Sequence, residues 1–154
     1  GYTVGVLVNA NHGTREQLTI AGVPVGRELR GYPAERTRSA SSIVMIAATD
    51  APLSARQLER LALRMAMGLA RTGATANTSS GDLMLAFSTA KFGSAPLDDE
   101  RVSPLYQAAV EATEESVLNA LALGTDVVGV DGTVCPALPL DRVVALLKAR
   151  GVIQ

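Results

Sequence analysis

The chain has few of the residues that mark metal-binding, disulfide-rich and nucleic-acid-binding proteins. It has one cysteine, Cys135, and one histidine, His12, so neither an internal disulfide nor a structural zinc cluster can form. Trp is absent and aromatic residues make up 3%, which leaves little surface for stacking on bases. With 14 basic and 15 acidic residues, the net charge of −1 gives no positive footprint for nucleic acid. We expect no metal, no other cofactor and no nucleic-acid partner, and we expect Cys135 to be a packed or loop thiol with a structural role.

Long hydrophobic runs are also missing. The longest runs fall well short of the roughly 18 residues that cross a bilayer, and no charged leader precedes a hydrophobic segment. We therefore expect a soluble, cytoplasmic protein with no membrane partner. The composition, 47% hydrophobic and 19% charged, is that of one globular domain with a proper core. The chain begins in strand-like sequence at Gly1 without an initiator Met, so we expect it to be part of a longer polypeptide.

Apolar runs predict strands at residues 2–8, 43–48, 83–88 and 127–130. The first two are unbroken enough to predict burial on both faces, with Gly5 allowing a close neighbour. A short return strand at 17–21 is predicted to form a hairpin with the first, and residues 22–40, which lose all periodicity, predict a surface loop.

Capping residues and glycines mark three helices. The first carries an apolar stripe that is expected to face a sheet, and the second has a face of small residues. A turn at Asp131 and Gly132 precedes the last helix, at 141–150. The residues that mark the helix ends are Ser54 and Gln57 with Gly73, Ser103 and Pro104 with Gly124, and Gly151.

Ser41 and Ser42 stand at a boundary. A basic, turn-rich segment at 32–40 precedes them, and the buried strand at 43–48 follows. Such a position suits a nucleophile held by a rigid strand, and also a site of chain cleavage. Ordinary turn chemistry is the alternative, and for an isolated pair of serines it is the commoner explanation.

Other polar residues are weaker candidates, each with a structural alternative. Asn11, at a strand end beside a glycine, presents an amide to a reaction centre or forms an Asx turn. His12 is a candidate general base, but no acidic partner for it is evident nearby in the sequence, which favours a partly exposed turn residue. Ser80 and Asp82, two apart in extended chain, form a relay pair or belong to a solvated loop. We assign Asp50 to a turn.

Five motifs in order carry a family resemblance. They are GYTVGVLV at 1–8 with Asn11, IAGVPVGRE at 20–28, ATDAPL at 48–53, GLARTG at 68–73, and SGD at 80–82 leading into LAFST at 85–89. Together they resemble the L-aminopeptidase/D-amidase-esterase family, which includes the β-peptidyl aminopeptidases and is related in fold to ornithine acetyltransferases. The likeness spans nearly the whole chain, and the combination is far more specific than any one motif.

The resemblance implies a self-processing hydrolase with an α/β fold, a four-layer αββα sandwich of the N-terminal-nucleophile type. Family members are made as a precursor about twice this length, which is cut before a Ser or Thr. Residues 1–41 then correspond to the end of the larger subunit, and residues 42–154 to the smaller subunit, which begins with the nucleophile Ser42. The upstream part of the larger subunit is an expected partner.

The resemblance also implies roles for single residues. Asn11 matches the family's oxyanion asparagine, while Ser80 and Asp82 match a hydroxyl and an acid that assist the nucleophile. The chain departs from the closest pattern twice: Ser41 stands where Gly often precedes the cut, which leaves the cut uncertain by one residue, and Asp82 is a methylene shorter than the Glu of some relatives. The base for Ser42 is either its own freed α-amino group or the Ser80–Asp82 pair.

The expected function is an aminopeptidase, amidase or esterase that releases N-terminal residues from short peptides or amino-acid amides without a metal. One alternative is an acyltransferase of the ornithine acetyltransferase type, which Ser rather than Thr at position 42 disfavours. The other is a catalytically inert, oligomeric interaction module. We expect a homo-oligomer, with the small-residue helix at 103–123 as a possible contact between subunits.

Overall fold

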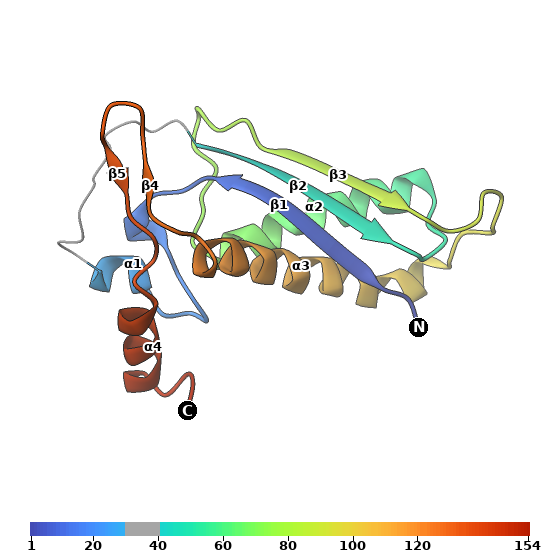
Figure 1. The fold of residues 1–154 in the computed structure, drawn as a ribbon. Helices are drawn as coiled ribbons and strands as arrows, with labels where there is room; N and C mark the ends of the chain where they lie inside the picture. Colours follow the sequence, from blue (N-terminus) through green and yellow to red (C-terminus); the bar gives the residue numbers. More distant parts are fainter. Residues whose placement is uncertain (30–40) are drawn as a thin grey trace.

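A three-stranded sheet with two long helices on one face forms the centre of the chain (Figure 1). The computed structural model describes residues 1–29 and 41–154. The strands β1 (Val4–Asn11), β2 (Ser42–Thr49) and β3 (Leu83–Ser88) lie in that order, with β1 antiparallel and β3 parallel to β2. The helix α2 (Ala55–Arg71) makes the crossover between β2 and β3, and α3 (Asp99–Ala122) follows β3. The sequence-based strands at 43–48 and 83–88 are confirmed.

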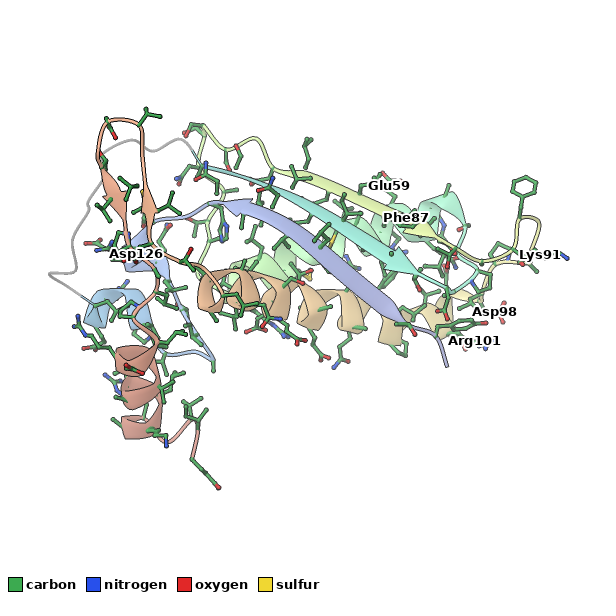
Figure 2. The ribbon with its side chains drawn as sticks, in the orientation of Figure 1. Glu59, Phe87, Lys91, Asp98, Arg101 and Asp126 are labelled. Atoms are coloured by element: carbon green, nitrogen blue, oxygen red, sulfur yellow. The ribbon has the colours of Figure 1, made fainter. Side chains whose placement is uncertain are left out.

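The two faces of the sheet differ sharply in burial. On β2, Ile43, Met45 and Ala47 are at most 1% exposed and pack with residues of α2 and α3. The side chains between them point to the other face, which no described element covers (Figure 1). The prediction that the strands at 2–8 and 43–48 are buried on both faces is therefore wrong for the described residues. The large apolar side chains exposed there are Leu7, Val44, Leu83, Leu85 and Phe87, the last labelled in Figure 2.

Helix α2 forms as its sequence predicts. Ser54 accepts a hydrogen bond from the Gln57 amide, and the Gln57 side chain accepts one from the Ser54 amide, which completes the capping box. Gly73, with φ +92°, ends the helix in the left-handed region. Gly68 lets α3 approach closely, because a Cβ there would lie 2.3 Å from the Val110 carbonyl oxygen. Of the small residues of α3, Ala109 is fully buried and packs in the core of the chain.

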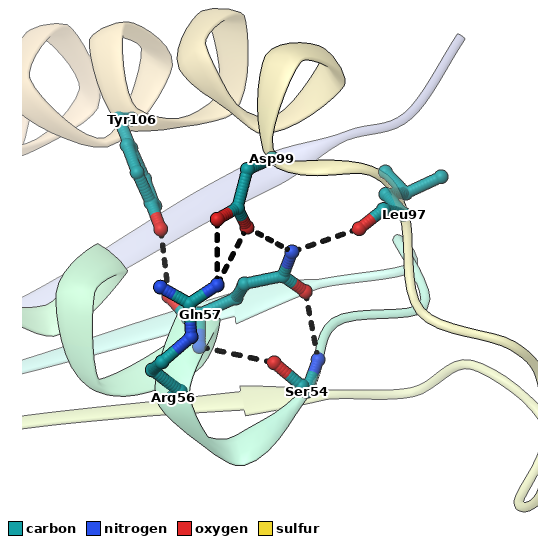
Figure 3. Close-up of polar contacts among 6 residues, drawn as sticks. All are labelled: Ser54, Arg56, Gln57, Leu97, Asp99 and Tyr106. Atoms are coloured by element: carbon teal, nitrogen blue, oxygen red, sulfur yellow. Dashed lines mark hydrogen bonds and ion pairs between the residues drawn. The ribbon is translucent and has the colours of Figure 1, made fainter.

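Helix α3 begins at Asp99, earlier than the predicted cap at Ser103, so that Pro104 lies inside the helix. The reason is a tertiary contact (Figure 3). The buried Gln57 amide donates 2.8 Å bonds to the Leu97 carbonyl and to Asp99 Oδ1, and Arg56 pairs with Asp99 Oδ2 at 2.6 Å. These contacts fix the chain at the point where the helix begins.

The segment after β1 does not form the predicted return strand at 17–21. It forms a short 3-10 helix, η1 (Arg15–Gln17), an isolated bridge between Ile20 and Val23, and one helical turn, α1 (Val25–Glu28). Gly26 makes this compact path possible, because a Cβ there would lie 1.6 Å from the Arg15 carbonyl oxygen. The predicted loop at 22–40 therefore includes α1, and its residues 30–40 lie outside the described part of the chain.

The C-terminal part lies beside the end of the sheet where β2 begins (Figure 1). Two short strands, β4 (Val127–Val128) and β5 (Val134–Cys135), form a hairpin around the predicted turn, and α4 (Leu140–Ala149) is the predicted last helix. Val143 and Leu147 of α4 pack with Val25 and Leu29 in a second core. Cys135 is exposed, so of the two predicted settings the packed one is wrong: the hairpin that holds it is only two residue pairs long.

Candidate active site

The last residue of β1 and the first residue of β2 are register partners. Asn11 lies opposite Ser42 in the antiparallel ladder, so their side chains stand on the same face with Cβ atoms about 4.5–5.5 Å apart. That face is the uncovered one, because Ile43, the next residue, points into the core. The predicted nucleophile and the predicted oxyanion amide are thus brought together at an accessible sheet end.

The Ser42 hydroxyl lies against the peptide bond that precedes it. Its Oγ donates to the Ser41 carbonyl oxygen at 2.8 Å and accepts from the Gly81 amide at 3.1 Å. Ser41 itself is 7% exposed, so this peptide unit is largely shielded from solvent. The hydroxyl is therefore held close to an acyl group with an N–H donor aimed at its oxygen. The role of Gly81 as a hydrogen-bond donor to Ser42 was not predicted from the sequence, although Gly81 lies in the SGD motif.

The predicted pair of Ser80 and Asp82 is formed. Ser80 Oγ donates to Asp82 Oδ1 at 2.6 Å, and both side chains are half-buried. A 2.8 Å bond from the Ser80 amide to the Asn77 carbonyl shapes the loop that carries them. Gly81, between the two residues, is the point at which this loop contacts Ser42.

His12 takes part in this cluster, contrary to its assignment as a turn residue without an acidic partner. Its Nδ1 is buried and has no hydrogen-bond partner among the described residues. Burial lowers the pKa of His12, and the negative charge of Asp82 opposes that shift. Asp82 is 70 positions away in the chain, so sequence proximity gave no sign of this interaction.

Two cavities adjoin His12. The smaller has a volume of about 10 Å³ and the larger about 170 Å³. The smaller is lined on its polar side by His12, Ser41, Ser80 and Asp82, together with Gln17, Thr75 and Asn77. The polar groups of the cluster therefore share one small enclosed space next to the Ser41–Ser42 peptide bond.

The remaining acidic candidates lie away from this cluster. Asp50 Oδ1 accepts a 2.7 Å bond from the Thr3 amide at the far end of the sheet, which confirms its structural role in a turn. Figure 2 labels Asp98 at that same far end. In residues 1–29 and 41–154, no group of three His, Cys, Asp or Glu side chains is placed to hold a metal ion. No helix in those ranges is long and apolar enough to cross a membrane.

The sequence profile of peptidase family S58 matches residues 1–135. Among curated proteins, the beta-peptidyl aminopeptidase BapA of Sphingosinicella xenopeptidilytica is 38% identical over 172 aligned residues, which cover 97% of this chain and 43% of that protein. The chain therefore spans less than half the length of this relative.

Two solved structures are similar over the same extent. A beta-aminopeptidase from Burkholderia sp. has a TM-score of 0.87 and 41% identity, and the match covers 100% of this chain and 46% of that one. The L-aminopeptidase D-Ala-esterase/amidase of Ochrobactrum anthropi, a prototype of the serine aminopeptidases, has a TM-score of 0.86 and 40% identity, over 99% of this chain and 45% of that one. The latter is a variant of the Ntn hydrolase fold, and this chain has the corresponding part of it.

Proposed function

Because the chain belongs to peptidase family S58, we propose that it is the nucleophile-bearing part of a self-processing serine aminopeptidase, active also on amides or esters. One observation carries the proposal. The Ser42 hydroxyl is 2.8 Å from the Ser41 carbonyl oxygen, and Asn11 stands opposite Ser42 on the same sheet face. In this proposal residues 1–41 end the larger subunit, and residues 42–154 form the smaller one.

Self-cleavage begins with the Ser42 hydroxyl. Its oxygen attacks the Ser41 carbonyl carbon, the peptide C–N bond breaks, and the hydroxyl proton ends on the Ser42 nitrogen. An ester between Ser41 and Ser42 results, and water opens it. The Gly81 amide, which donates to Oγ at 3.1 Å, holds the hydroxyl in place and favours the loss of its proton.

In the mature enzyme the same hydroxyl attacks the substrate's amide or ester carbonyl. The freed α-amino group, with a pKa of about 7.7–8.0 in model peptides, is one base for this step, and the Ser80–Asp82 pair is the other. The Asn11 amide then stabilises the oxyanion, an interaction that contributes about 3–4 kcal/mol to the transition state in comparable sites. The scissile bond breaks, the shortened peptide, amine or alcohol leaves with a proton, and the N-terminal residue stays as an ester on Ser42. Water then opens this acyl-enzyme, which releases the N-terminal residue and restores the hydroxyl.

The uncovered sheet face supports a fold larger than this chain. Contiguous exposed apolar surface on a soluble protein usually marks a contact, and Leu7, Leu83 and Leu85 are each at least 58% exposed on this face. We propose that an upstream part of a longer polypeptide supplies a second sheet that packs here. With helices outside both sheets, the result is the four-layer αββα sandwich. A homo-oligomeric state and a cytoplasmic location also belong to this proposal.

The proposal is tested by Ser42→Ala in the full length that the gene encodes. The variant should stay in one piece on a denaturing gel, while the wild type yields two, the smaller beginning with Ser42 by intact mass. Ser41→Ala is the matched control, because it alters the neighbouring residue and keeps the nucleophile, so it should still be cut. Normal processing of Ser42→Ala would rule out the assignment.

Activity needs its own test. The processed wild type should release chromogenic anilides from amino acids or short peptides, and Ser42→Ala should not. A wild type that is processed but releases none of these products would point instead to an inert interaction module.

A further inference from the structure

His12 lines two cavities beside the end of β1. The smaller, of about 10 Å³, is also lined by Ser41, Ser80 and Asp82. A space of that size holds about one water. The cavity is therefore of the right size for a single water molecule beside the Ser41–Ser42 peptide unit.

The larger cavity, of about 170 Å³, has apolar walls from Leu18, Val117 and Leu121 and polar ones from Thr14, Arg15, Gln17 and Thr72. Ser41, Ser80 and Asp82 line the smaller cavity and not the larger. The smaller cavity is therefore the side on which His12 meets the residues of the candidate site.

His12 Nδ1 needs such a partner. The atom is buried and unpaired among the described residues, whereas buried polar atoms in folded proteins are nearly always paired with protein or with ordered water. A buried water makes two to four hydrogen bonds, and Ser41, Ser80 and Asp82 supply polar atoms around the same space. One water can satisfy Nδ1 and still bond to the other polar groups.

We propose that Nδ1 of His12 binds and deprotonates the water that opens the ester formed between Ser41 and Ser42 during self-cleavage. The inference rests on the proposed function and adds to it a catalytic residue for its hydrolytic step. Ser41 lines the cavity, and its carbonyl carbon is the atom that this water attacks in the proposal.

The step balances as follows. The water oxygen bonds to the Ser41 carbonyl carbon while one water proton moves to Nδ1. The bond from that carbon to Ser42 Oγ then breaks, and the imidazolium returns the proton to Oγ. Ser41 is left with a carboxyl group, and Ser42 with a free hydroxyl and a free α-amino group. No other reactant is consumed.

The imidazole is in the right state for this role. Because burial lowers its pKa, His12 is neutral at pH 7, and the tautomer with its proton on Nε2 leaves a lone pair on Nδ1. The charged residues that line the two cavities are Asp82, whose carboxylate opposes the shift, and Arg15 of η1 on the side of the larger cavity.

The test compares His12→Phe with the wild type at the full length that the gene encodes. Phe keeps a ring between the cavities but cannot accept a proton, so self-cleavage should slow by about 100-fold. Hydroxylamine, a small nucleophile that opens esters without a base, should restore cleavage and leave a hydroxamate on Ser41, which mass spectrometry detects. His12→Asn, which keeps a polar group near the place of Nδ1 but no base, should be slow and should also respond to hydroxylamine.

Two outcomes would overturn the inference. His12→Phe may be cut at the wild-type rate, in which case no base is needed at this position. It may instead be slow and unaffected by hydroxylamine, in which case His12 acts on the first step or on folding. A wild type that is never cut would be a failure of the proposed function.

A crystal structure of full-length Ser42→Ala distinguishes a failure of this inference from a failure of the proposed function. One water within about 3.2 Å of His12 Nδ1 supports the water site whether or not the wild type is processed. A protein side chain that fills the cavity would overturn it.

Discussion

Asn11 and Ser42 face each other across the β1–β2 ladder, although 31 positions separate them in the chain. The pairing places a carboxamide and a hydroxyl on one sheet face, each attached to a strand of the same ladder. The ladder fixes the spacing of the two backbones at this point. A rigid pair of this kind suits an oxyanion donor, whose contribution depends on being in place before charge develops.

Replacing Asn11 with Ala should lower kcat by about 100- to 1,000-fold and change KM little, because the lost bond forms only in the transition state. Asn9→Ala is the matched control: Asn9 lies on the same face of β1, two residues away, opposite Val44. It should keep wild-type kinetics. Steady-state assays on an amino-acid anilide measure both. A rise in KM without a fall in kcat for Asn11→Ala would assign the residue to substrate binding.

Asp82→Asn should slow both self-cleavage and turnover, because the 2.6 Å bond from Ser80 would then lead to a neutral acceptor. We expect a loss of about 100-fold or more, the range for a group that moves or orients a proton. Asp82→Glu restores the charge with one more methylene and should recover part of the activity. If Asp82→Asn is as active as the wild type, the α-amino group of Ser42 alone serves as the base.

Much of the site was predictable from sequence because its members are marked locally. Ser42 stands at the junction of a turn-rich segment and an apolar strand, and the SGD motif carries Ser80 and Asp82 close together. His12 was not predictable, because its place in the site depends on the burial of one ring nitrogen and on a carboxylate that only the fold brings near. Both are tertiary properties.

The fold, like the site, was predictable where the signals are local and not where they depend on tertiary contacts. The capping box at Ser54 and Gln57 is complete within four residues, so its prediction was confirmed. The start of α3 was predicted wrongly, because Ser103 and Pro104 are good local signals that contacts from Gln57 override. Burial of the strands on both faces was also wrong for this chain: an unbroken apolar run shows that a strand needs cover, but not which segment provides it.

Gln57→Leu should destabilise the chain by about 2–3 kcal/mol, because it leaves the Leu97 carbonyl without its partner and removes one bond to Asp99. Arg56→Ala is the comparison. Its ion pair with Asp99 is exposed on both sides, so its loss should have little effect. Urea unfolding followed by circular dichroism gives both values. A larger loss for Arg56→Ala than for Gln57→Leu would mean that the ion pair, and not the buried amide, fixes the start of α3.

The stability of the chain should fall as the pH is lowered from about 7 toward 5, with His12 as the cause. Burial lowers the pKa of His12 in the folded state below its unfolded value of 6.5. Between these two pKa values the unfolded chain binds more protons, so the free energy of unfolding decreases as the pH falls. The contribution is complete above the unfolded pKa and is lost as the pH falls toward the folded one. The slope is at most about 1.4 kcal/mol per pH unit for one proton.

His12→Phe makes this test direct, because the chain has no second histidine. Its free energy of unfolding should vary less with pH between 7 and 5 than that of the wild type, whatever its absolute value. Urea titrations at several pH values within that range provide the comparison. Parallel curves for the two proteins would show that His12 has the same pKa folded and unfolded, and the burial of its ring nitrogen would then have no effect on protonation.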